Sequence, residues 1–387
     1  MIDFAIFNYS GIGENQGGPR GYLYNLFIGF KEIGIDIPFF SITNNDINFN
    51  LPRKTSNPLI EELKSIIYIF IKGFICYRKV NKNIHKFKII HVHSNEDVFY
   101  LRKFIRYKGK IILTSHRPQP LADESVTPII LRSKTKWRFF FLKLLYKYIE
   151  QYGYKKSNGF IFPSEGAMKI YNYFPGFSKH INNKPIRYVY TGVPMKQPDI
   201  SVEQYRNKLN ISISDKMLCY IGRHNYIKGY DLLTSLVHRL EENNIKVVCA
   251  GANNLLPSPI SNNWIEMGYI NDTYNLVNAS DVVVIPNRST YFDLIIIEAL
   301  SLGKIIVTSD TGGNLDIAKQ TKGVMLFKNG DKESLYDTII KAFSLSNEEK
   351  ESYINENILF YMNHCTVDKF ACNYLRAIKS LNSFFNI

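Results

Sequence analysis

Short apolar runs alternate with helix-like segments along most of the chain. Runs such as KIIHVHS (88–94), KIILTSH (110–116) and VVVIP (282–286) contain few polar positions, which predicts strands buried on both faces of a sheet. The segments after these runs have apolar residues at helical spacing. The alternation therefore predicts an α/β fold with parallel, doubly wound sheets.

The length of 387 residues fits two domains of ordinary size. The strand and helix pattern occurs twice, and a polar segment without a strand, 195–216, separates the two occurrences. We predict an N-terminal Rossmann-like domain over 1–196 and a C-terminal one over 197–365. A long helix is expected within 366–387 and could cross back to the first domain.

Charge is distributed unevenly between the two halves. Residues 1–200 carry a net charge of +16 and residues 201–387 a net charge of −2, which together give the +14 of the chain. The asymmetry predicts an anionic partner for the first half, either an acidic membrane or nucleic acid. A solvated basic face in a protein from an AT-rich organism is the simpler alternative. Nucleic acid is not expected, because no reader motif accompanies the charge.

The cysteines and the apolar segments favour a cytoplasmic protein. An odd number of cysteines without paired spacing argues against a disulfide framework. The N-terminal sequence MIDFAIFNYSG has no basic region before its apolar run, so it is not typical of a signal peptide. The longest apolar segment, 66–77, is interrupted by Lys72 and is shorter than the ~20 residues of a spanning helix. The cysteines are Cys76, Cys219, Cys249, Cys365 and Cys372.

Residues 131–156 predict one amphipathic helix with two alternative roles. Its large apolar side chains share one stripe, and basic side chains lie elsewhere around the helix. Such a helix can lie on an anionic bilayer with its aromatic side down. It can equally pack on its own sheet with its basic residues outward. The stripe contains Trp137, Phe140, Phe141, Leu144 and Tyr148, and the basic residues are Arg138, Lys143 and Lys147.

The second half carries a constellation suited to an anionic ligand. Residues 286–313 predict a β-α-β unit, and the turn before its helix leaves backbone N–H groups that favour a phosphate. Arg223 and Lys228 follow an earlier strand in the sequence GRHNYIKG, where two cations could clamp a diphosphate. Glu298, within the predicted helix, could hold two ribose hydroxyls.

Two features of the first half are weaker signals. The loop GIGENQGGPRG (11–21) has glycines that let backbone approach a ligand, but it lacks the third glycine of the dinucleotide fingerprint, so a flexible surface loop is the alternative. His116 follows a strand and is either structural or a ligand contact. His91 and His93 have no acidic partner at metal-ligand spacing, and we interpret them as core or edge residues.

These motifs, in their order and spacing, resemble those of glycosyltransferase family 4. The resemblance covers nearly the whole chain: the glycine loop, IIHVHS, TSH, IFPSE, YTGVP, GRHNYIKG and ALSLGKIIVTSDTGG. It implies the GT-B fold, with two Rossmann-like domains facing each other across a cleft. It also implies a retaining transferase that uses a nucleotide sugar as substrate and needs no metal or other cofactor.

The resemblance also implies roles for individual residues. Arg223 and Lys228 would neutralise the departing diphosphate, and His116 would contact the donor sugar near the reacting carbon; these are the expected catalytic residues. Glu298 matches the second glutamate of the family's E-x7-E motif and would hold the ribose. The remaining residues expected at the donor are Gly17, Gly18, Gly268, Tyr269, Thr290, Phe292, Asp293 and Leu294.

The sequence departs from the family pattern at one place. Thr290 stands where the first glutamate of E-x7-E would lie, and Asp293 stands where a glycine is usual. Threonine cannot bind a sugar as an anion, although Asp293 could compensate in part. The departure leaves the identity of the sugar open.

The expected function is a bacterial hexosyltransferase at the inner face of the plasma membrane. It would move a sugar from a nucleotide donor, with UDP favoured, to a lipid-linked or surface-polysaccharide acceptor in lipopolysaccharide or capsule synthesis. The anionic membrane would meet residues 131–156. Two alternatives remain: a non-catalytic GT-B subunit that binds glycan or supports a partner enzyme, and a sugar-nucleotide epimerase.

Overall fold

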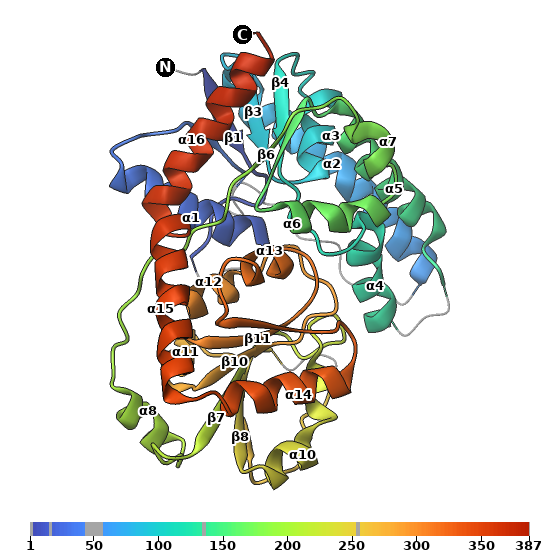
Figure 1. Ribbon diagram of the computed structural model, residues 1–387. Helices are drawn as coiled ribbons and strands as arrows, with labels where there is room; N and C mark the ends of the chain where they lie inside the picture. Colours follow the sequence, from blue (N-terminus) through green and yellow to red (C-terminus); the bar gives the residue numbers. More distant parts are fainter. Residues whose placement is uncertain (1–2, 15–17, 43–56, 134–136, 253–255, 387) are drawn as a thin grey trace. The chain divides into compact units, whose positions relative to one another are not determined.

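The chain forms two compact units, each built around one six-stranded parallel sheet (Figure 1). The predicted fold class, two parallel α/β domains, is confirmed. Unit 1 consists of Met1–Pro163, Met168–Val189 and Ala371–Ile387, and unit 2 of Ser164–Ala167 and Tyr190–Phe370. The computed structural model describes residues 3–14, 18–42, 57–133, 137–252 and 256–386.

The sheet of unit 1 has the order β2-β1-β3-β4-β5-β6. The chain leaves β1 toward β2 and then continues from β3 in the opposite direction. Such a reversal, here between β1 and β3, opens a crevice at the carboxyl ends of the strands. The strands are β1 (Phe4–Phe7), β2 (Phe39–Phe40), β3 (Ile89–Val92), β4 (Lys110–Leu113), β5 (Gly159–Phe162) and β6 (Ile186–Tyr188).

Helices cover both faces of this sheet, which explains why its central strands are apolar throughout. On one face lie α1 (Gly18–Glu32) and α16 (Val367–Phe384), and Tyr374 of α16 contacts the rings of Phe4 and Phe30. On the other face lie α2, α3 and α5 (Figure 1). Besides α1 and α16, the helical elements of this region are α2 (Pro58–Ile84), α3 (Asn95–Lys103), α4 (Leu121–Ser133), α5 (Phe140–Lys156), α6 (Glu165–Lys169), the 3-10 helix Ile170–Tyr173 and α7 (Phe177–Ile181).

The single helix predicted over residues 131–156 is wrong, because α4 ends at Ser133 and α5 begins at Phe140. Phe139, which is buried, has a φ of 50°, a left-handed conformation that interrupts the helical path. The helix α5 does pack within unit 1, through buried residues that include Leu142 and Ile149, but the start of its aromatic stripe is exposed. Phe140 and Phe141 are each 61% exposed.

The sheet of unit 2 has the order β12-β11-β10-β7-β8-β9. The chain runs outward from β7 to β9, returns to the other side of β7 as β10 and continues to β12. The strand order of unit 2 therefore reverses between β7 and β10. The strands are β7 (Lys216–Ile221), β8 (Ile245–Ala250), β9 (Trp264–Glu266), β10 (Val282–Ile285), β11 (Ile305–Ser309) and β12 (Val324–Phe327).

Alternate residues of β10 enter different cores, so this sheet is also covered on both sides. Val282 and Val284 pack with α9 (Tyr230–Thr234), α10 (Val237–Glu242) and α14 (Lys332–Phe343). Val283 and Ile285 face the opposite layer. That layer and the adjoining segment contain α8 (Val202–Lys208), α11 (Thr273–Ala279), α12 (Leu294–Ser301), α13 (Asn314–Ala318) and α15 (Asn347–His364). No helix in the described ranges is long and apolar enough to cross a membrane.

The C-terminal helix is tied to unit 1 by a buried hydrogen bond that can be tested. The Tyr374 hydroxyl lies 2.7 Å from Nδ1 of His91. Tyr374→Phe should lower the free energy of unfolding by about 1–3 kcal/mol, because Nδ1 of the buried imidazole loses its partner. Urea unfolding at constant m-value measures the change. Lys379→Ala, at an exposed position of the same helix, is the control, and equal stability of both variants would contradict the assignment.

Candidate functional site

The loops at the carboxyl edge of unit 2 pack so closely that glycine is required. Gly229 has a φ of 65°, and a Cβ there would lie 1.8 Å from the carbonyl oxygen of Pro286. Gly312 has a φ of 55°, and a Cβ there would lie 2.0 Å from the carbonyl oxygen of Thr290. The loops after β7, β10 and β11 are therefore fixed against one another, and their polar side chains are held in place.

Lys228 and Asp293 meet where the strand order reverses. Nζ of Lys228 donates to Oδ1 of Asp293 at 2.7 Å, which joins the loop after β7 to the loop after β10. Asp293 also accepts hydrogen bonds from the Asn287 amide and the Thr290 hydroxyl. Asp293 is the N-cap residue of α12, but its carboxylate makes no hydrogen bond to the helix amides. Asn287 was not predicted at this site, and only its place after a strand could have indicated it.

Arg223 and Glu298 supply further polar groups to this unit. Arg223 is exposed after β7, and its carbonyl accepts a 2.9 Å hydrogen bond from the Tyr220 hydroxyl. Its guanidinium has no ion pair within the described part of the chain. Glu298 is half-buried on α12, and burial raises the pKa of its carboxyl, while the charge of Lys196 opposes that rise.

The other residues predicted in unit 2 lie in loops and at a helix start. Gly268 has a φ of 65°, and its carbonyl accepts from the Gly251 amide at 2.8 Å. Tyr269 beside it is 70% exposed. Phe292 and Leu294 are partly buried against the core that contains α12. Their backbone amides remain the predicted phosphate contacts.

In unit 1, His116 belongs to a cluster of histidines. Nε2 of His116 lies 3.1 Å from Nδ1 of His93, and the His93 ring centre lies 4.4 Å from that of His91. Nε2 of His91 lies 2.8 Å from the Thr114 hydroxyl. Sequence reasoning did not pair His93 with His116, because nothing in their spacing shows that β3 and β4 are neighbours.

Of the two glycines predicted to contact the donor from the first half, Gly17 and Gly18, the structure describes Gly18. Gly18 is the first residue of α1 and has a φ of 66°, and a Cβ there would meet no atom of the described residues within 4 Å. Gly17 lies outside the described residues.

Burial holds the clustered histidines neutral at ordinary pH. Burial, together with the charge of His116, lowers the pKa of His91 to about 3, and burial with Arg117 lowers that of His116 to about 3. Burial, with His91 and His116, also keeps the pKa of His93 well below its usual range. The imidazole of His116 can therefore donate or accept one hydrogen bond, but it brings no positive charge.

Residues 201–359 match the family model described as Glycosyl transferases group 1. The matched segment includes Arg223, Lys228, Asp293 and Glu298. A curated relative, an uncharacterized glycosyltransferase of Methanocaldococcus jannaschii, is 26% identical over 192 residues, which cover 43% of this chain and 49% of the relative. The chain thus spans about half the length of that relative.

Solved structures with the same fold match nearly the entire chain. Sucrose-phosphate synthase from Thermosynechococcus elongatus has a TM-score of 0.71 at 14% identity, with 99% of this chain and 100% of that chain covered. The trehalose 6-phosphate synthase of Burkholderia multivorans has a TM-score of 0.68 at 12% identity, with 100% and 98% covered. Anabaena HepE in complex with UDP-glucose has a TM-score of 0.65 at 14% identity, with 98% and 99% covered. These likenesses, at 12–14% identity, establish the fold.

The neutral histidines predict a specific pH dependence of stability. Below about pH 6.5 the histidines of the unfolded chain become protonated, whereas those of the folded cluster stay neutral. The free energy of unfolding therefore decreases as the pH falls from 7 toward the depressed pKa values. Each histidine should contribute up to about 1.4 kcal/mol per pH unit. His93→Asn should reduce this slope in denaturant titrations between about pH 5 and 7, whereas His238→Asn, at an exposed position, should not. Equal slopes in all three proteins would contradict the neutral cluster.

Proposed function

We propose that this protein is a glycosyltransferase that holds the diphosphate of a nucleotide-sugar donor at the carboxyl edge of unit 2. One observation carries the proposal. Arg223 and Lys228 both follow β7, next to the reversal of strand order, in the segment that matches the group 1 model. Ligands of doubly wound sheets bind at such reversals, and paired cations there suit a diphosphate.

The remaining groups of unit 2 suit the other parts of the donor. The first turn of α12 offers amides that the Asp293 carboxylate does not cap, and such amides favour phosphate oxygens. The Glu298 carboxylate could accept from the ribose hydroxyls. We favour a UDP-sugar, which the bound UDP-glucose and UDP of HepE support by analogy.

In the proposed reaction, negative charge develops beside Arg223, Lys228 and the amides of α12. The bond between the sugar carbon and the diphosphate oxygen breaks, an acceptor hydroxyl bonds to the same carbon, and the hydroxyl proton is released. Negative charge develops on the leaving diphosphate, so cations and amides fixed beside it stabilise the transition state. From the family resemblance we propose retention of configuration and independence of metal ions, with Arg223 and Lys228 supplying the positive charge.

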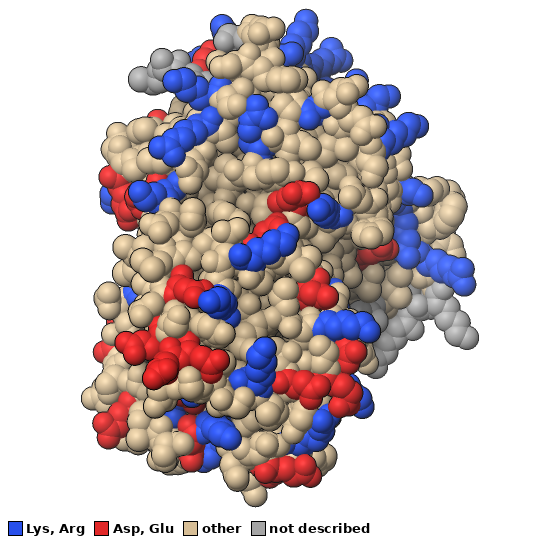
Figure 2. Space-filling model, viewed as in Figure 1, with Lys and Arg blue, Asp and Glu red and all other residues tan. Residues whose placement is uncertain are grey.

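We propose a lipid-linked or surface-polysaccharide acceptor at the inner face of a bacterial plasma membrane. The basic first half supports this placement, with a net charge of +16 over residues 1–200. Figure 2 shows Lys and Arg predominating over the part formed by unit 1. Lipopolysaccharide or capsule synthesis would use such an acceptor.

The ion pair of Lys228 favours a second candidate function. Because Asp293 already neutralises Lys228, the same fold could serve as a non-catalytic subunit that binds glycan or supports a partner enzyme. Incubation of the purified protein with UDP-sugars distinguishes the candidates. Release of UDP or transfer excludes the non-catalytic subunit, and conversion of the donor sugar without an acceptor would indicate an epimerase.

Arg223→Ala should reduce transfer by a hundredfold or more while the fold stays intact, because an electrostatic contact in the transition state is worth about 3 kcal/mol. The same variant should lose most of the thermal stabilisation by UDP. Turnover with a soluble acceptor and thermal shift measure both effects. Lys341→Ala, an exposed lysine of the same unit, is the control.

Lys228 requires a paired design, because its removal leaves the Asp293 carboxylate without its cation. Lys228→Met combined with Asp293→Asn removes both charges and should abolish transfer without loss of stability. Asp293→Asn alone keeps the cation and should still bind UDP. Near-normal turnover of both Arg223→Ala and the double variant would refute the proposed clamp.

A further inference from the structure

Helix α2 exposes a stripe of large apolar side chains along most of its length. From Ile60 on, the members recur at intervals of three and four residues, as on a helix face that packs against a partner. Each is between 45% and 57% exposed. The stripe contains Leu59, Ile60, Leu63, Ile67, Phe70, Phe74 and Tyr77.

This stripe is separate from the side of α2 that packs into unit 1. Ile69, Cys76, Val80 and Ile84 are buried, and they lie roughly a quarter turn around the helix from the stripe. The helix therefore has two apolar sides, of which one serves the core. Single exposed apolar residues need no explanation, but a continuous row of them indicates a binding surface.

Helix α5 carries a second exposed stripe. Phe140, Phe141, Leu144 and Tyr148 are between 48% and 61% exposed, and Trp137 before the helix is 38% exposed. The sequence placed these side chains on one stripe of a helix, and the structure shows that this stripe is turned to solvent.

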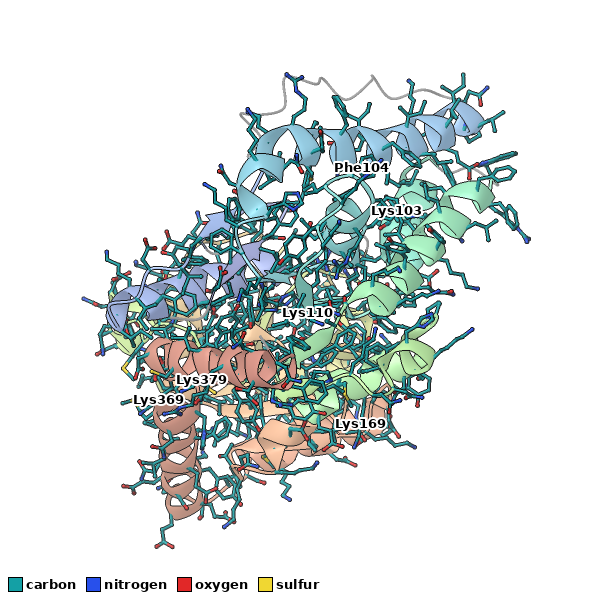
Figure 3. All side chains as sticks on the ribbon, turned by 90° about the horizontal axis from the view of Figure 1, so that it is seen from above. Lys103, Phe104, Lys110, Lys169, Lys369 and Lys379 are labelled. Carbon is teal, nitrogen blue, oxygen red and sulfur yellow. The ribbon has the colours of Figure 1, made fainter. Side chains whose placement is uncertain are left out.

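A chain of aromatic ring contacts runs from the stripe of α2 to the stripe of α5. The ring centres of Phe70 and Phe104 lie 6.3 Å apart, and those of Phe104 and Phe99 lie 5.9 Å apart. Phe99 in turn lies 6.4 Å from Tyr148 of α5. Figure 3 shows Phe104 between α2 and α5.

Hydrogen bonds connect the two helices near their N-terminal ends. The buried carboxylate of Glu62 on α2 accepts from the Trp137 indole at 2.7 Å and from the Leu142 amide at 2.8 Å. Helices α2 and α5 are therefore neighbours in unit 1, and their two exposed stripes together are called here the α2–α5 face.

The charges beside the α2–α5 face indicate its partner. Arg78 and Lys82 follow the stripe along α2, and Arg138 and Lys147 lie within the segment 137–148 that carries the second stripe; all four side chains are exposed. Aromatic and aliphatic side chains with a basic margin are typical of helices that lie in the interface of an anionic bilayer. A second copy of the chain would instead bring two such basic margins together, which is unfavourable.

We propose that the α2–α5 face docks on an anionic lipid bilayer, and that the stripe of α2 supplies much of the buried apolar surface. This inference deepens the membrane placement within the proposed function and rests on it for its biological role. Its test needs neither donor nor acceptor, so failure of docking and failure of transfer are distinguishable.

The test is co-sedimentation of the full chain with vesicles of phosphatidylcholine alone or mixed with phosphatidylglycerol. The wild type should bind the anionic vesicles more strongly, and binding should weaken with salt. Ile67→Asn with Phe74→Asn should weaken binding at least about tenfold, since two apolar side chains no longer enter the bilayer. Arg78→Glu with Lys82→Glu should remove the preference for anionic vesicles.

Controls keep the outcome decisive. Ile260→Asn with Leu359→Asn replaces apolar residues of unit 2 that are 99% and 60% exposed, and it should leave vesicle binding unchanged. Thermal unfolding should be similar for all variants, because the substituted side chains are exposed in the free protein. Absence of vesicle binding by the wild type, or equal binding by the α2 variant, would overturn the proposal. So would a shift from dimer to monomer in sedimentation of that variant with vesicle binding unchanged, which would make the face a self-association surface.

Discussion

The ion pair between Lys228 and Asp293 joins the loops that follow β7 and β10. These two strands are parallel neighbours in the sheet of unit 2, and the strand order reverses between them. Parallel strands bring their carboxyl ends to one edge, and the reversal between β7 and β10 leaves room there for side chains. The glycine positions 229 and 312 let backbone pass within contact distance of neighbouring carbonyls, so the loops cannot shift independently. The charged groups are therefore placed before any ligand binds, which is the condition for electrostatic stabilisation without reorganisation.

Much of this arrangement could be predicted from the sequence because it depends on local patterns. Apolar runs bounded by glycine and polar residues identified the strands, and the end of one of those runs identified the loop after β7 that carries Arg223 and Lys228, whereas Glu298 lies within α12. The pairing of Lys228 with Asp293 could not be predicted, since it depends on which strands are neighbours. The same holds for His93 and His116, which meet only because β3 and β4 pair.

Other features escaped prediction because helical periodicity shows that a stripe exists but not what covers it. The apolar residues of α2 would suit a core helix equally well, and only the structure separates the buried Ile69 and Cys76 from the exposed Phe70 and Phe74. The break at Phe139 was missed for a related reason. A left-handed φ at a bulky residue has no sequence signature, and tertiary burial of the Phe139 ring stabilises it.

The departure at Thr290 has a physical explanation in unit 2. The Thr290 hydroxyl donates to the carboxylate of Asp293, which also holds Lys228. Thr290 itself is buried. A glutamate at position 290 would bring a second carboxylate to the first, and two carboxylates in one buried site cannot both stay ionised without cost. Threonine at 290 is thus compatible with an ionised aspartate at 293, whereas a glutamate at 290 would raise the cost of that charge. The carboxylate at this place is that of Asp293, three positions after Thr290, and it is held by the Lys228 ammonium, the Asn287 amide and the Thr290 hydroxyl.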